Sequence, residues 1–195
     1  MIRRSLIVFL AATSLAATVN AVPSRINMFP PEVADDIWWD LESANEIPLW
    51  PYSARSGFTR RIRLSISGIN RLKVSIRIDE RAKGRRIGRL VLTGWYRGAQ
   101  LDEVRSFRPS SKAMRELDDL IAKSDLWSIS PEHYVLKDGD DICVDGEQLV
   151  FERTDARGYR IASANAQCNA PLKVLRIARQ IIEISGASEA LGLLN

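Results

Sequence analysis

The chain has 195 residues, of which 46% are hydrophobic and 27% are charged, and its formal net charge is +4 at pH 7. This composition excludes disordered, collagen-like and disulfide-dense proteins, and it is typical of one globular domain with a substantial core. The charge is unevenly distributed, because residues 55–97 contain 13 basic and two acidic residues.

Residues 1–21 have the features of a secretory signal peptide. Two arginines precede an apolar run over about residues 6–19, and Val19 and Ala21 flank a small-residue cleavage site. The apolar run is shorter than the roughly 20 residues that cross a bilayer, so we expect no transmembrane segment after signal cleavage. The sequence therefore predicts an exported protein, periplasmic or secreted.

Residues 22–50 form an acidic segment that is rich in tryptophan. Apolar residues recur at helical spacing after Pro31, a residue that suits the first turn of a helix, so we predict a short helix over residues 31–44. The tryptophans either pin this segment onto its own domain or serve as anchors for a partner.

We predict a single α+β domain over residues 51–186, followed by a C-terminal tail over residues 187–195. Between residues 60 and 97, apolar side chains alternate with mostly basic ones, which is typical of strands with one buried and one charged face. We predict an antiparallel meander of three strands, with turns near residues 67–70 and 80–85.

Two helices are expected in the second half of the chain. An apolar stripe predicts the first over residues 112–124, and a second stripe begins after Pro171 and ends at Gly186. Because strands and helices are partly segregated along the chain, we expect both helices to pack on one face of an antiparallel sheet.

A β-hairpin is predicted over residues 141–168, with its turn centred between Asp155 and Ala156. This centre places Cys143 and Cys168 opposite each other at the open end of the hairpin, within disulfide reach. An exported protein with two cysteines is expected to pair them.

The sequence lacks the motifs of several enzyme classes. His133 is the single histidine, which excludes sites that need two, and there is no G-x-S-x-G elbow and no glycine-rich phosphate-binding motif. We expect no cofactor and no metal. An acidic loop precedes the hairpin and is interpreted as solvated, with calcium binding as the alternative. Its residues are Asp138, Asp140, Asp141, Asp145 and Glu147.

The basic face of the predicted meander is the main functional candidate, because arginines crowded across neighbouring strands repel one another unless an anion lies between them. The charge is balanced either by the acidic residues 32–46, or simply by counterions and water, or by an external anion: an anionic glycan, a glycolipid or an acidic protein. The exported location disfavours nucleic acid. The candidate ligand-binding residues are Arg61, Arg63, Arg71, Lys73, Arg77, Arg89, Trp95 and Arg97.

We therefore favour a non-catalytic binding or interaction domain over an enzyme. The alternative is a small cell-envelope hydrolase that uses carboxylates, because glycosidases need only two well-placed ones. Its candidates are Asp140, Asp141 and Glu147. Nothing in the sequence specifies an oligomeric state.

The second half of the chain also shows a recurring order of short motifs. It contains a helix that ends in D-L-W, a D-G sequence before a strand, a G-Y-R return strand and the closing helix PLKVLRIARQIIEISG. Over about residues 110–186, this order resembles the C-terminal module of uncharacterised exported bacterial proteins. The resemblance implies a location in the bacterial envelope and no catalytic residues.

Overall fold

The computed structural model describes residues 28–34, 37, 41–50, 57–68, 72–96, 98–129, 146–168 and 170–188. The predicted signal peptide lies outside these ranges, as do His133 and most of the acidic loop. Within them, no helix is both long enough and apolar enough to cross a membrane.

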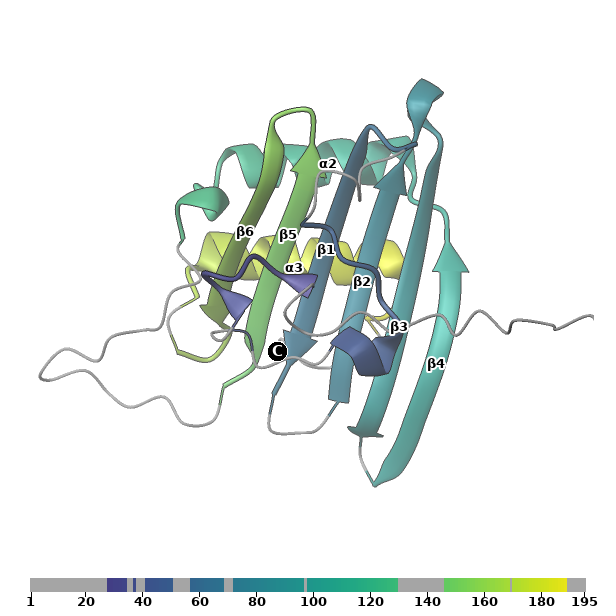
Figure 1. Ribbon diagram of the computed structural model, residues 1–195, viewed down its shortest axis with the longest axis vertical. Helices are drawn as coiled ribbons and strands as arrows, with labels where there is room; N and C mark the ends of the chain where they lie inside the picture. Colours follow the sequence, from purple (N-terminus) through teal and green to yellow (C-terminus); the bar gives the residue numbers. More distant parts are fainter. Residues whose placement is uncertain are drawn as a thin grey trace, which may run out of the picture.

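Six antiparallel strands form one sheet, in the order β4-β3-β2-β1-β5-β6 (Figure 1). The first four strands make a meander, and the β5–β6 hairpin joins the sheet beside β1, so that β1 and β2 lie at its centre. The α+β class predicted from the sequence is confirmed. The strands are β1 (Arg60–Ser67), β2 (Leu72–Glu80), β3 (Arg86–Tyr96), β4 (Ala99–Phe107), β5 (Gln148–Asp155) and β6 (Gly158–Asn165).

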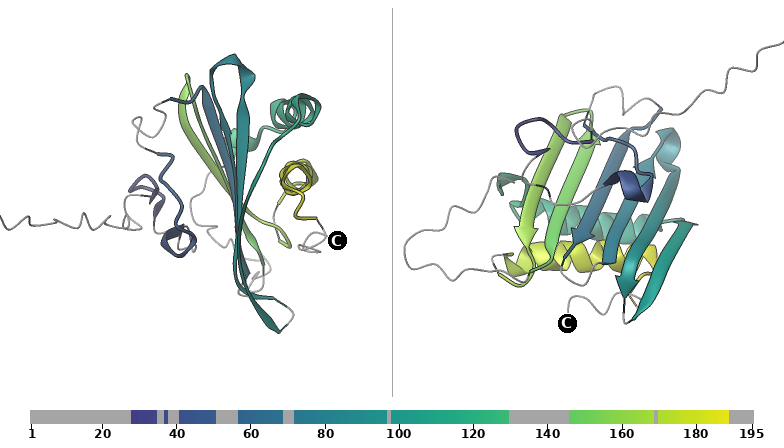
Figure 2. Two further views of the ribbon diagram at one scale, coloured as in Figure 1. Left: turned by 90° about the vertical axis from the view of Figure 1, so that its right-hand side faces the viewer. Right: turned by 60° about the horizontal axis from the view of Figure 1, so that its bottom comes forward.

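Two α-helices cover one face of this sheet, as predicted (Figure 2). α2 (Ser111–Ala122) is capped at its N-terminus, where the Ser110 hydroxyl accepts a hydrogen bond from the Ala113 N–H at 3.1 Å. α3 (Leu172–Ser185) ends at Gly186, which has a φ of 69° and forms the left-handed cap that glycine adopts readily. The main core lies between these helices and the apolar residues of the strands.

The N-terminal segment covers the opposite face of the sheet, so the molecule has three layers (Figure 2). Its apolar side chains pack on Val91 and Val150 and form a second, smaller core. In place of the predicted helix over residues 31–44, the described residues form a turn at 31–33 and the short 3-10 helix η2 (Leu41–Ala44). The described residues form two further 3-10 helices, η4 (Ala82–Gly84) and η5 (Leu126–Ser128).

Strand β4 was not expected from the sequence. It is an edge strand with several charged side chains, and only Leu101 and Phe107 pack partly against the main core, so it lacks a continuous apolar face. Phe107 on β4 is directly opposite Gly88 on β3. A Cβ added at Gly88 would lie 2.2 Å from the Phe107 ring. Gly88 therefore provides the space that holds the end of β4 on the sheet.

The predicted hairpin is present, but its turn centre is one residue later than expected, which moves each cross-strand partner by two residues. Asp155 pairs with Gly158, which places the turn centre between Ala156 and Arg157, because Gly158 adopts the positive φ of 107° at the start of β6. The regular pairing ends at Asn165, so Cys168 lies in a turn beyond the strand.

The predicted partner of Cys168 is Cys143, which lies outside the described residues. No cysteine in the described part of the chain is a free thiol. The pairing of Cys143 with Cys168 therefore stays a prediction, although the ladder does not place the two residues directly opposite each other as expected.

Candidate functional site

Three of the candidate arginines form a row across adjacent strands. Arg63 on β1 is directly opposite Arg77 on β2, and Arg77 is directly opposite Arg89 on β3. We refer to Arg63, Arg77 and Arg89 as the arginine row. Glu152 on β5 continues the row on the other side of Arg63. The side chains of this row point away from the helices, into the layer covered by the N-terminal segment.

Glu46 of the N-terminal segment provides the anion that the arginine row requires. Its fully buried carboxylate forms ion pairs with Arg77 and Arg89 and lies 3.6 Å from Nη1 of Arg63. Arg63 is also fully buried, forms an ion pair with Glu152, and donates a hydrogen bond to the Ile47 carbonyl at 2.7 Å. For these three arginines, the structure therefore shows the first of the predicted counter-charges, an acidic residue of the N-terminal segment.

Tyr159 completes this buried network from β6. Its hydroxyl donates a hydrogen bond to Oε1 of Glu152 at 2.9 Å. Burial, and then the negative charge of Glu152, raises the pKa of Tyr159 well above its ordinary value, so the hydroxyl keeps the proton that it donates. Glu152 thus has a cation on one oxygen and a neutral donor on the other.

The other residues predicted on this face are separate from the arginine row. Arg61 forms an ion pair with Asp79 at 3.3 Å and stacks on the Phe58 ring at 3.7 Å. Lys73 is partly buried, and Trp95 is 51% exposed. Arg71 and Arg97 lie outside the described residues. An external anion would therefore have to displace Glu46 or Asp79 to reach most of the described arginines on this face.

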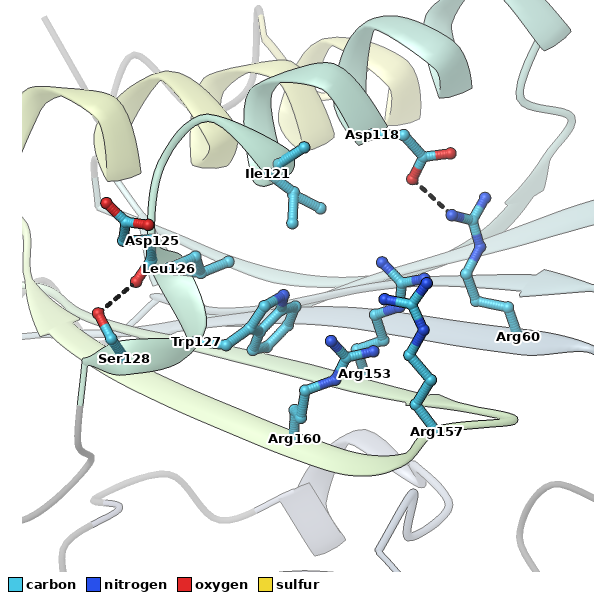
Figure 3. A pocket seen from close by; sticks show the side chains of 11 residues that line it. Arg60, Asp118, Ile121, Asp125, Leu126, Trp127, Ser128, Arg153, Arg157 and Arg160 are labelled. Carbon is cyan, nitrogen blue, oxygen red and sulfur yellow. Dashed lines mark hydrogen bonds and ion pairs between the residues drawn. The ribbon is translucent and has the colours of Figure 1, made fainter.

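A second group of arginines lies on the helix side of the sheet and lines a pocket of about 480 Å³. We call this site the arginine pocket. Figure 3 shows the guanidinium groups of Arg153, Arg157 and Arg160 pointing into the same space beside Trp127. The lining residues are Arg60, Asp118, Ile121, Ala122, Asp125, Leu126, Trp127, Ser128, Arg153, Arg157 and Arg160.

The hairpin turn explains why these arginines come together. Arg153 and Arg160 are directly opposite each other on β5 and β6, and Arg157 lies in the turn that joins the two strands. Arg60 is at the start of β1, where Asp155 is its neighbour across the ladder. The end of α2 and η5 form the opposite wall, so the pocket lies between a charged hairpin end and the edge of the helix layer.

Asp155 holds the hairpin arginines in place. Its carboxylate accepts hydrogen bonds from Nε of Arg153 at 2.6 Å, from Nη2 of Arg160 at 2.9 Å and from the backbone N–H of Arg157 at 2.8 Å. Burial acts to raise the pKa of Asp155, but these donors and positive charges outweigh it, so the pKa is lowered. Asp155 therefore stays ionised at neutral pH.

Donor capacity remains after these internal contacts. The exposed side chain of Arg157 forms no ion pair or hydrogen bond within the described part of the chain, and Nε of Arg160 is buried without a hydrogen-bond partner there. Burial lowers the pKa of Arg153, and the charges of Arg60 and Arg160 add to this effect while Asp155 opposes it. An anion in the pocket would relieve this crowding of positive charge.

Trp127 and Arg60 complete the walls of the arginine pocket. The guanidinium carbon of Arg160 lies 5.5 Å from the centre of the Trp127 ring, within the range of a cation–π contact. Arg60 forms ion pairs with Asp118 on α2 and, at 2.7 Å, with Glu80. The indole and Asp118 therefore fix two of the arginines and leave Arg157 as the most accessible one.

The arginine pocket was missed from the sequence, although a signal was present. The eight-residue stretch RTDARGYR contains three arginines, but its turn residues predict only a hairpin turn. Arg153 and Arg160 share a face of the hairpin both in the predicted register and in the observed one, so the alternation alone already placed them on the same side.

The carboxylates of the hydrolase alternative are described only in part. Glu147 is buried, its Oε2 lacks a hydrogen-bond partner within the described residues, and burial raises its pKa even though Gln167 opposes the shift. Asp140 and Asp141 lie outside the described residues. No group of His, Cys, Asp or Glu side chains suited to a metal occurs among those described.

Comparison of the sequence with protein-family models and with curated proteins gives no match.

Proposed function

We propose that this protein is a non-catalytic binding domain of the bacterial envelope that binds an anionic group in the arginine pocket. The observation that carries the proposal is the convergence of three guanidinium groups from one hairpin on a space of about 480 Å³. Small-molecule sites have volumes of about 300–1,000 Å³ and a few convergent polar groups, and this pocket has both properties.

The ligand class follows from the donors. A planar guanidinium group donates paired hydrogen bonds whose geometry matches the oxygens of phosphate and carboxylate. The same group can also stack on an aromatic ring. A phosphate or carboxylate group on an exported glycan or glycolipid, or on an acidic protein, has the required charge. The envelope location depends on the predicted signal peptide, and we further propose that a Cys143–Cys168 disulfide stabilises the hairpin that carries the arginines.

Isothermal titration with inorganic pyrophosphate as the probe tests this proposal. We expect salt-sensitive binding to the unmodified protein, and at least about tenfold weaker binding to the Arg157→Ala variant. Arg176→Ala is the matched control, because Arg176 is also an exposed arginine but lies on α3 and does not line the pocket. Equal weakening in both variants would show that binding depends only on the net charge of the protein, which would contradict the proposal.

A third variant distinguishes the two arginine regions. Lys73 lies on the strand face that carries the arginine row, so Lys73→Ala removes a cation there without breaking an ion pair of Glu46. We expect the affinity for pyrophosphate to be unchanged. Weaker binding to Lys73→Ala together with full binding to Arg157→Ala would place the site on the strand face instead.

A further inference from the structure

The outer edge of β4 has no neighbouring strand among the described residues, so half of its backbone groups are available for hydrogen bonding. β4 is the last strand of the sheet, and it pairs with β3 through a ladder that starts at Tyr96 and Ala99. A two-residue connection closes on a hydrogen-bonded pair, and hydrogen-bonded pairs then alternate along an antiparallel ladder. The backbone groups of Ala99, Leu101, Glu103, Arg105 and Phe107 therefore point toward β3. Those of Gln100, Asp102, Val104 and Ser106 point outward.

Apolar side chains accompany this open edge. Val104 is 57% exposed, and it lies directly opposite Val91, which the N-terminal segment covers. Ile87 and Trp95 are also large exposed apolar side chains, and both lie on the same face of β3 as Val91. Val104 is therefore the exposed apolar side chain of β4 itself, and Ile87 and Trp95 are separate exposed apolar residues at the two ends of the neighbouring strand.

The charges of β4 favour one symmetric pairing of the strand with a second copy of itself. In an antiparallel pair, opposed residues share a face, so a two-fold axis must pass through one residue position. Centres at Asp102, Glu103 or Arg105 would place a charge opposite the same charge. A centre at Val104 instead places Val104 opposite itself and Glu103 opposite Arg105 in both directions.

The backbone pattern agrees with this centre. The outward-pointing N–H and C=O groups of Val104 would exchange hydrogen bonds with those of the second Val104, as a hydrogen-bonded pair requires. Leu101 would lie opposite Phe107, which joins two partly buried apolar side chains. Glu103 and Arg105 are each about half exposed. Nη2 of Arg105 donates a hydrogen bond to the Gly186 carbonyl oxygen at 2.7 Å, which orients the guanidinium group.

We propose that two copies of this chain associate through antiparallel β4–β4 pairing about a two-fold axis at Val104. The product is one continuous antiparallel sheet in which the helix layers of both copies lie on the same face. The two Val104 side chains become neighbours, and the unpaired edge of β4 is removed. This proposal does not depend on the arginine pocket.

Sedimentation velocity of the purified protein over about 1–100 µM tests the association. We expect a dimer that dissociates on dilution, and a dissociation constant at least about tenfold higher for Val104→Lys, because that variant places a cation opposite itself. Since Val104 is exposed in a single copy, the variant retains its fold, which circular dichroism checks. A monomer throughout the range, or an unchanged dimer in Val104→Lys, overturns the proposal.

Cross-linking tests the register. A hydrogen-bonded antiparallel pair has Cα atoms about 5.5 Å apart, so Val104→Cys should form a disulfide-linked dimer under mild oxidation. Asp102→Cys is the control, because the two copies of residue 102 would be about 14 Å apart along the strands. Cross-linking of Asp102→Cys that equals or exceeds that of Val104→Cys contradicts the centre at Val104.

Discussion

The arginine row and the arginine pocket contain the same residue type on opposite faces of one sheet, yet their surroundings differ. In the row, Glu46 and Glu152 lie among three arginines, and the side chains are largely buried. In the pocket, Asp155 and Asp118 orient the arginines but leave Arg157 exposed. A basic surface is therefore available to a ligand only where the protein's own carboxylates do not occupy it.

Removal of Glu46 should have the largest effect on stability. The Glu46→Ala variant leaves three neighbouring arginines with one buried carboxylate, and breaking a buried ion pair costs about 3–5 kcal/mol. We expect this loss in the free energy of unfolding, measured with urea. Glu116→Ala is the control, because Glu116 is half exposed and forms only a 3.9 Å pair with Lys112. A loss below about 1 kcal/mol would mean that the row does not need Glu46.

The second effect concerns Asp155 and depends on pH. Asp155→Asn should lower the free energy of unfolding by about 2–3 kcal/mol at pH 7, because hydrogen bonds to a charged acceptor are lost. The pKa of Asp155 is lowered in the folded protein, so its stabilisation is present above the ordinary value of 3.8 and is lost as the pH falls through the folded-state pKa. The difference between the two proteins should therefore shrink from pH 6 to pH 3; a constant difference would contradict this assignment.

A smaller effect is expected for Tyr159→Phe. This change removes the donor to the buried carboxylate of Glu152 and should lower the free energy of unfolding by about 1–2 kcal/mol. Because Tyr159 belongs to the network of the arginine row, pyrophosphate affinity should not change. A stable variant with impaired binding would show that the two regions are coupled through β6.

Arg157→Ala should change stability least. Arg157 is exposed and contributes only its backbone N–H to Asp155, so thermal unfolding should shift by no more than about 0.5 kcal/mol in free energy. The same variant should show the largest loss of anion binding. A variant that loses stability and affinity together would indicate that the pocket, like the row, is structural.

The sequence predicted the elements whose residues alternate or repeat clearly. β1 to β3, both helices and the hairpin were found because their apolar periodicity is strong. β4 escaped because an edge strand with Asp102, Glu103 and Arg105 has little apolar signal. The helix predicted over residues 31–44 was wrong in its described part, because packing on Val91 and Val150 holds that segment in a turn and a 3-10 helix.

The candidate site was harder to predict because it depends on register. The alternation of β1 and β2 correctly grouped Arg63 with Arg77, and the acidic N-terminal segment was one of the two anions considered for them. Periodicity alone does not show which of the two anions is present, since that depends on how the segment crosses the sheet. The pocket also depends on long-range packing, because Arg60, Asp118 and Trp127 come to the hairpin turn from distant parts of the sequence.

The position of Glu152 in the arginine row also affects the order of folding. β1 pairs with β2 through a short connection, but its other neighbour is β5, and the ion pair between Arg63 and Glu152 spans 89 positions of sequence. Chain segments this far apart pay a large loop-closure entropy, so their pairing follows the local meander. The meander therefore forms while its arginines are only partly neutralised, because Glu152 has not yet joined the row. The charges of the arginine row are balanced only when the β5–β6 hairpin pairs with β1, so the row forms after the meander.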